Sequence, residues 1–192
     1  EYTGANGATP VLTSLGAPGA NRNAMAFGSA TSNGAAYVGK AAAVHKRSGN
    51  VFVATSALPA GAATITDVAM DPDNDQIVFA VDDNQVFRSI NGGSAWTDVT
   101  GNLPSISSFD FRTIEFIPDG NNDSVVLGTR SGVYSVAVNS ATWALFGSGL
   151  PNVLVFDLRY VANNQTLYAG TLGRGVWSTP VTIDTLFRNG FE

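Results

Sequence analysis

Four charged side chains stand at corresponding places in a repeated pattern and have the chemistry for acid–base catalysis or ligand binding: Asp67, Glu115, Asp157 and Arg159. Asp67 and Asp157 share one column of the pattern, and Glu115 and Arg159 share the column two residues further on. A glycosidase needs two carboxyl groups about 5–9.5 Å apart. If the strands that carry these columns line one channel, the four side chains meet there. The alternative, which we favour, is structural: Glu115 pairs with Arg159 between neighbouring units, and the aspartates cap strand ends.

Two short segments alternate side-chain oxygen ligands in the manner of a calcium-binding loop. They comprise Asp71, Asp73, Asp75, Asp119, Asn121 and Asp123. Neither segment continues into the glycine and distal glutamate that complete such a loop. Both fall between apolar runs, where Asp and Asn favour turns. The sequence therefore predicts turns at these places, with no metal ion and no cofactor.

No residue is assigned a catalytic role. The chain has one histidine, His45, and no Gly-x-Ser-x-Gly motif that would present a nucleophilic serine. Trp96, Trp143 and Trp177 could stack on sugar rings. Because they stand at repeat positions, core packing is the interpretation we favour for them.

Charge and composition exclude several classes of protein. The 192 residues carry a net charge of −5, with a pI near 4.7 and no cluster of Lys or Arg, which argues against a nucleic-acid ligand. No run reaches the roughly 18 apolar residues of a membrane-spanning helix. The absence of cysteine excludes disulfides and thiolate metal sites. Few lysines and many Asn, Gly, Ser and Thr favour an extracellular protein.

The elements that would position these side chains come from an internal repeat. Pro18, Pro59, Pro104 and Pro151 follow one another at 41, 45 and 47 residues. The third apolar run of three units carries a valine followed by an aromatic residue, at Val86-Phe87, Val133-Tyr134 and Val176-Trp177. Short apolar runs separated by Asp, Asn and Gly are typical of antiparallel meanders. A period of about 45 residues predicts an all-β propeller of four four-stranded blades.

The predicted domain covers residues 10–180, with units at 19–59, 60–104, 105–151 and 152–180. Residues 1–9 are expected to form a flexible arm and residues 181–192 a C-terminal tail. The last unit supplies three runs without a clear fourth. We expect residues 10–18, which match a fourth run, to complete it as a closing strand, with 182–187 as the rival candidate. Alternate residues of the first runs are expected in the core, namely Met25, Val68, Ile114, Leu158, Phe27, Met70, Phe116 and Tyr160.

The segment from Ser89 to Trp96 resembles the Asp-box, Ser-x-Asp-x-Gly-x-Thr-Trp, of BNR-repeat propellers. It matches at Ser89, Gly93 and Trp96 and departs at Asn91 and Ala95. The resemblance, to sialidase-like, xyloglucanase-like and sortilin-type propeller repeat proteins, implies a fold. It implies no activity, since the box is a structural turn whose Trp packs between blades. The final residues, DTLFRNGFE, resemble an ending of exported gammaproteobacterial proteins, which implies a secreted or cell-surface bacterial protein.

Taken together, the sequence predicts a non-catalytic extracellular propeller module for binding, scaffolding or self-assembly, with a glycan or protein ligand. The alternative is a fragment of a polysaccharide-degrading glycoside hydrolase. Four blades can close alone, belong to a larger ring or be completed by a neighbouring chain. The last arrangement predicts a homo-oligomer formed through sheet edges, because unpaired strand edges recruit partners.

Overall fold

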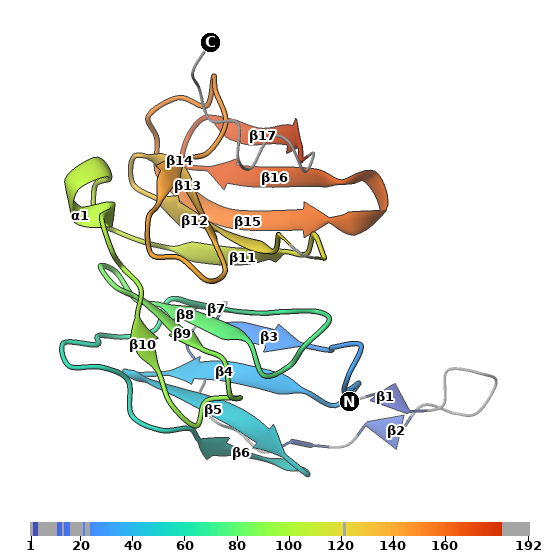
Figure 1. The fold of residues 1–192 in the computed structure, drawn as a ribbon. Coiled ribbons are helices and arrows are strands. Elements are labelled where there is room, and N and C mark those ends of the chain that lie inside the picture. Colours follow the sequence, from blue (N-terminus) through green and yellow to red (C-terminus); the bar gives the residue numbers. More distant parts are fainter. Residues whose placement is uncertain are drawn as a thin grey trace.

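The computed structural model describes residues 2–3, 11–12, 14–15, 21, 24–120 and 122–181, and nearly all of their regular structure is β-strand. Four antiparallel sheets follow one another along the chain, each built from consecutive strands (Figure 1). We call them blades 1 to 4. Blade 1 consists of β3 (Met25–Phe27), β4 (Ala36–Lys40), β5 (Ala43–Ser48) and β6 (Val51–Ala54). Blade 2 consists of β7 (Asp67–Met70), β8 (Val78–Val81), β9 (Val86–Ser89) and β10 (Thr97–Asp98).

The second half of the chain repeats this plan with one difference. Blade 3 consists of β11 (Thr113–Ile117), β12 (Ser124–Thr129), β13 (Gly132–Ala137) and β14 (Ala144–Leu145). Blade 4 has three strands in the described part of the chain, β15 (Val155–Val161), β16 (Thr166–Thr171) and β17 (Gly175–Pro180). Two single turns of helix lie between strands, α1 (Leu103–Ile106) and the 3-10 turn η1 (Ala162–Asn164). The predicted all-β class and four-blade plan are confirmed.

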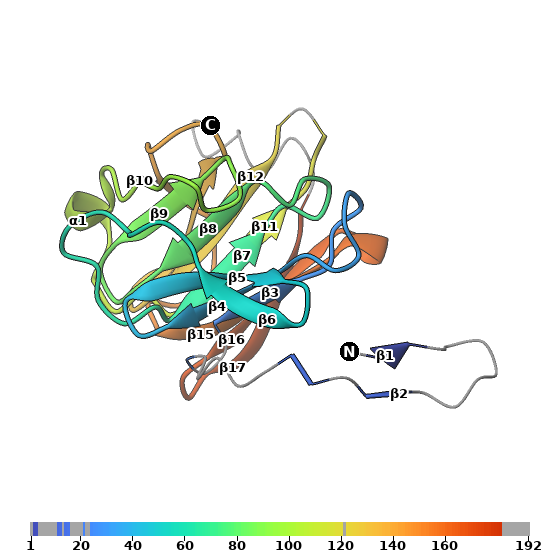
Figure 2. The same cartoon turned by 90° about the horizontal axis from the view of Figure 1, so that it is seen from below.

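The N-terminal residues pair differently from the expected closing strand. β1 (Tyr2–Thr3) and β2 (Val11–Leu12) form a two-stranded sheet of their own, apart from blade 4 (Figure 2). Pairing of segments so close in sequence closes only a short loop, which costs little entropy. Most of the remainder of 1–9 and 10–18, and all of the rival strand 182–187, lie outside the described residues.

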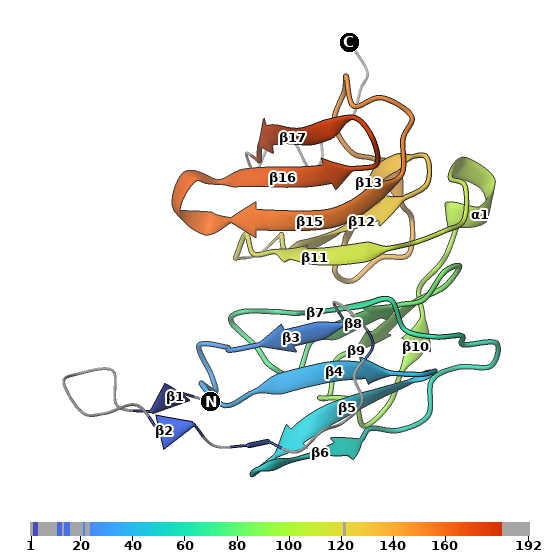
Figure 3. The same ribbon diagram turned by 180° about the vertical axis from the view of Figure 1, so that it is seen from behind.

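The blades are arranged so that their first strands lie innermost. β3 packs against β7, β7 against β11, and β11 against β15, while the later strands of each blade lie progressively further out (Figures 1 and 3). The middle strands β8 and β12 are buried along their whole length. A strand with a blade on either side must be apolar on both faces, which explains the unbroken apolar run Val78–Val81.

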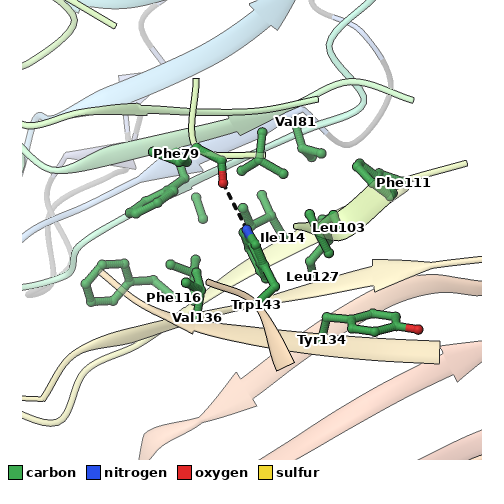
Figure 4. Close-up of a cluster of buried hydrophobic side chains, with 14 of the residues drawn as sticks. Phe79, Val81, Leu103, Phe111, Ile114, Phe116, Leu127, Tyr134, Val136 and Trp143 are labelled. Atoms are coloured by element: carbon green, nitrogen blue, oxygen red, sulfur yellow. Dashed lines mark hydrogen bonds between the residues drawn. The ribbon is translucent and has the colours of Figure 1, made fainter. Parts of the chain in front are cut away.

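Three apolar clusters fill the spaces between successive blades. The largest joins blades 2 and 3 around Trp143, whose indole Nε1 donates to the Val99 carbonyl at 2.9 Å (Figure 4). Most of the expected first-strand core residues are buried. Tyr160 is only partly buried. Met25 and Phe27 are exposed over 56% and 71% of their surface. Their column faces the preceding blade, and no blade precedes β3 in the described part of the chain.

Side-chain hydrogen bonds hold the turn between β9 and β10. The Ser89 hydroxyl accepts the Gly93 N–H at 2.8 Å, and the Asn91 side chain accepts the Ala95 N–H at 2.8 Å. Gly92 and Gly93 have φ values of 65° and 86°, a region that glycine occupies without strain. The Trp96 indole reaches across to Thr55 of blade 1 at 3.2 Å. Ser89 and Asn91 therefore stabilise the turn, and Trp96 contributes to the contact between blades 1 and 2.

Candidate functional site

The first strands of all four blades border one depression, which we call the central hollow. Its volume is about 320 Å³. Its main lining residues are Met25 and Phe27 of β3, Val68 and Met70 of β7, Glu115 and Phe116 of β11, and Arg159 and Tyr160 of β15. Because residues alternate across a strand, each first strand presents its side chains in turn to a neighbouring blade and to this space. Most of the residues that line the hollow are apolar, and they are joined by one carboxyl and one guanidinium group.

Asp67, at the start of β7, joins blade 2 to blade 3. Its Oδ2 accepts the Ile114 backbone N–H at 2.9 Å, and its Oδ1 accepts the Val68 N–H at 2.8 Å. Burial raises the pKa of Asp67 from the ordinary 3.8 to about 7, and the charge of Glu115 acts in the same direction. The hydrogen bonds from these amides and from Thr113 oppose the rise. A large share of this carboxyl group is therefore protonated at neutral pH.

Glu115 makes the corresponding contact between blades 3 and 4. Its Oε1 accepts the Tyr160 backbone N–H at 2.9 Å, and the neighbouring Thr113 hydroxyl accepts the Leu158 N–H at 3.2 Å. Burial raises the pKa of Glu115, while the Tyr160 amide and the positive charge of Arg159 oppose the rise. The side chains of the first strands thus hold the backbone of the next blade.

A second, smaller depression of about 90 Å³ adjoins the central hollow and is more polar. Asp67, Glu115, Asp157 and Arg159 all line it. Asp157 lies near enough to Glu115 for its charge to favour the protonated form of that group. Asp157 and Arg159 themselves are exposed on β15. With Arg112, which also lines the depression, the arrangement places three carboxyl groups and two guanidinium groups beside an apolar surface.

The exposed large apolar side chains of the central hollow belong to blade 1. Met25 and Phe27 project beside the hollow with more than half of their area accessible. Exposed apolar side chains next to charged groups are typical of a surface that binds another molecule. The geometry therefore suits a ligand with an apolar group and a polar or charged neighbour.

Comparison with solved structures identifies the architecture. Over 81% of its length the chain matches an ancestral GH74 enzyme, with 23% identity and a TM-score of 0.56. It matches YCF48 bound to D1 peptide over 80% of its length (14% identity, TM-score 0.59), and a chain of a nidogen/laminin complex over 85% (11% identity, TM-score 0.64). The fold is that of a β-propeller.

The likeness shows the fold of this propeller and leaves its activity open, since all three identities are low. The chain spans 24%, 48% and 62% of those three structures, which is less than two thirds of each. No family model matches the sequence, and no curated protein matches it. In the described ranges, no helix has the length and apolar character to traverse a membrane.

The structure brings the four predicted channel residues of the propeller together at the polar depression. The favoured structural interpretation agrees with the contacts of Asp67, whose Oδ1 caps the start of β7. It differs for Glu115, whose hydrogen-bond partner is the backbone of Tyr160, with Arg159 acting through its charge. A backbone partner leaves no trace in the identity of the neighbouring residue, so sequence reasoning could not find it.

The calcium candidates lie in the loops after β7 and β11. Asp71 accepts the Asp73 N–H at 2.7 Å, and Asp123 accepts the Asp119 N–H at 2.7 Å, so these carboxylates cap turns. Asp75 interacts with Lys46 of blade 1 at 4.0 Å, and Asn121 lies outside the described residues. Among the described residues, no three acidic or histidine side chains converge as metal ligands would.

Sequence reasoning missed Met25 and Phe27 as surface residues. Their column is buried in later blades, so periodicity placed them in the core. The available signal was that the 18 residues before the first unit are fewer than one repeat, and no blade packs against β3 from that side among the described residues.

Proposed function

We propose that this chain is a non-catalytic, extracellular bacterial propeller module that binds a polypeptide ligand at the central hollow. The observation that carries the proposal is the hydrogen bonding of two inner-strand acids, Glu115 in the hollow and Asp67 in the adjoining polar depression. Asp67 and Glu115 each accept a backbone N–H of the following blade, so both are committed to holding blades together. The large apolar side chains of the hollow that remain exposed are those of Met25 and Phe27.

Two of the similar solved structures, by their descriptions, contain a bound peptide or a protein complex. They support a polypeptide as the ligand class, because a propeller can present its inner strands to an extended chain. Composition and the C-terminal segment support export. Detection of the chain in the culture medium of its source, and not in washed cells, would test the location.

Binding can be tested with random dodecamer peptides displayed on phage. Peptides selected by the wild-type chain should lose at least about tenfold in affinity against Phe27→Ser, since a largely exposed aromatic residue at the centre of a contact carries much of its energy. Ile90→Ser is the matched control, because Ile90 is 62% exposed and lies in the β9–β10 turn away from the hollow. Equal binding by both variants, or selection of no peptide, would refute the proposal.

The second candidate, a glycoside hydrolase fragment, is favoured by one observation. Asp67 and Glu115 have raised pKa values, and Asp157 lies nearby, a combination that acid catalysis on sugars uses. Release of reducing ends from xyloglucan by the wild-type chain, abolished in Asp67→Asn, would establish this candidate. The absence of hydrolysis together with peptide binding would establish the first.

A further inference from the structure

The fourth strand of each complete blade is attached at one recurring backbone hydrogen bond. The Thr55 N–H donates to the Val44 carbonyl at 2.9 Å in blade 1. The Val99 N–H donates to Val86, and the Phe146 N–H donates to Val133, both at 2.8 Å, in blades 2 and 3. Val176 occupies this column in blade 4. In the described part of the chain, β17 pairs with β16 alone, so its outer edge carries no fourth strand.

The outer edge of β17 has the groups needed for strand pairing. The Val181 N–H donates to the Gln165 carbonyl at 2.7 Å and therefore points toward β16. Because backbone groups alternate along a strand, the N–H and C=O groups of Val176 and Ser178 point the other way. Such an edge is a template for a further strand.

The valine–aromatic pair is more exposed in blade 4 than in blade 2, as expected beside an open strand edge. Val86 and Phe87 of blade 2 are fully buried, whereas Val176 and Trp177 of blade 4 are 74% and 40% exposed. In blade 2, Val86 packs in the cluster shared with blade 3, and Phe87 packs in the cluster shared with blade 1. Among the described residues, no fourth strand lies beside Val176 and Trp177.

An apolar hollow beside β17 marks where a side chain of an added fourth strand would lie. It measures about 60 Å³ and is lined by Val133, Phe146 and Leu150 on one side and by Leu167, Ala169 and Trp177 on the other. We call it the β17 hollow. The column counterparts of these residues surround Trp143 in the core between blades 2 and 3. Trp143 comes from the fourth strand region of blade 3 and is 2% exposed.

We propose that the β17 edge is a second polypeptide-binding site, which takes an extended segment of a partner protein as the fourth strand of blade 4. The segment runs antiparallel to β17, as β14 runs to β13. It pairs with Val176 and Ser178 and places one aliphatic side chain in the β17 hollow. The volume suits a branched aliphatic group better than an indole. This mode of recognition draws affinity from main-chain hydrogen bonds and specificity from the pocket.

The site is independent of the central hollow, with which it shares no lining residue. The partner segment is defined by the three fourth strands that the chain already contains. In blades 2 and 3 these read Trp-x-x-Val and Trp-x-x-Phe, ending at the residue that donates to the valine carbonyl. The expected ligand pattern is therefore aliphatic-x-x-apolar in an extended conformation.

The probe is a fluorescein-labelled peptide with the sequence of residues 141–148, which include the fourth strand of blade 3, and with the change Trp143→Leu. Anisotropy titration against the full chain should show saturable binding, at least about tenfold tighter than for the same peptide with Trp143→Asp. Hydrogen exchange followed by NMR should show the amides of Val176 and Ser178 slowed at least about tenfold by the first peptide. The amide of Ile90, on an exposed turn, should not change.

Two variants of the chain distinguish pairing with the β17 edge from nonspecific peptide binding. Ser178→Pro removes an outward N–H that the β16 ladder does not use, so it should abolish binding while leaving the melting temperature close to that of Ser178→Ala. Ser178→Ala keeps the N–H and should bind normally. If Ser178→Pro fails to fold, exchange at Val176 in the wild-type chain decides the question.

Three outcomes would overturn the proposal. One is the absence of protection at the β17 amides, and another is equal binding of the Leu and Asp peptides. The third is protection of those amides in the chain without peptide, because residues 10–18 or 182–187 of the chain itself, or a second copy detected by light scattering, would then occupy the edge. Phe27→Ser can weaken binding of the phage-selected peptides while the labelled peptide still protects the β17 amides. That result would assign the loss to the central hollow and leave the β17 site supported.

Discussion

Replacement of Asp67 by asparagine tests whether a carboxyl group held between blades governs the pH dependence of stability. The asparagine side chain would keep an oxygen that can accept the Ile114 N–H, and it removes the charge. The pKa of Asp67 is raised to about 7 in the folded chain from an ordinary value of 3.8. A raised pKa means that the folded state holds the proton more tightly than the unfolded state. The stabilisation is therefore complete below about pH 4 and is lost as the pH rises through about 7.

The expected size follows from the two pKa values. The difference between 3.8 and about 7 corresponds to about 4 kcal/mol, at about 1.4 kcal/mol for each pH unit. The free energy of unfolding of the wild-type chain should thus fall by up to about 4 kcal/mol between pH 4 and pH 8 on account of this group. Glu115, whose pKa is also raised, adds to the fall in both proteins. The Asn variant also loses one acceptor, a pH-independent cost of about 1 kcal/mol.

The measurement is urea unfolding at pH 4.5, 5.5, 6.5, 7.5 and 8.5, followed by the fluorescence of buried tryptophan, chiefly Trp143. The difference between wild type and Asp67→Asn should change steadily in favour of the variant as the pH rises. Asp83→Asn, at an exposed turn position, is the control and should follow the wild type throughout. Parallel curves for wild type and Asp67→Asn would show that burial does not raise the pKa of Asp67 as described.

The remaining predictions concern the contacts between and within blades. Trp143→Phe removes the bond to the Val99 carbonyl and part of a buried ring, and should lower the free energy of unfolding by about 2–3 kcal/mol in urea titrations; a loss below about 0.5 kcal/mol would contradict the packing described. Thr113→Val leaves the Leu158 N–H without its acceptor and should cost about 1–3 kcal/mol, with faster exchange of that one amide as the specific sign. Ser89→Ala should cost about 1 kcal/mol by freeing turn amides, and an unchanged melting temperature would count against a structural role for the box.

Much of the fold could be predicted from the sequence because the repeat records how each blade meets its neighbours. The column of Trp143 also holds Trp96 in the preceding unit, since the space between two blades recurs from one unit to the next. The same reasoning failed for Met25 and Phe27, whose column is buried only where a blade precedes. Periodicity describes the residue and its strand. It does not say whether the neighbouring sheet exists.

The candidate site was predicted in part for a related reason. The side chains of Asp67, Glu115, Asp157 and Arg159 were placed near one another because they share two columns of the inner strands. Their burial and partners could not be derived, because the hydrogen bonds of the two acids go to main-chain amides. The three runs of the last unit indicated that β17 would lack a fourth strand from within that unit. The volume and lining of the β17 hollow could not be derived, because they depend on how blades 3 and 4 pack.

The bonds from Asp67, Thr113 and Glu115 to main-chain amides bear on how such a chain evolves. An amide is present at every position except proline, so the receiving blade satisfies the bond whatever its own side chains are. Each blade can then accumulate side-chain substitutions without a compensating substitution in the neighbouring blade. A blade added by tandem duplication would carry the same acceptor side chains and could accept backbone N–H groups of the blade that follows it. The number of blades could then change while the contacts between blades stay the same.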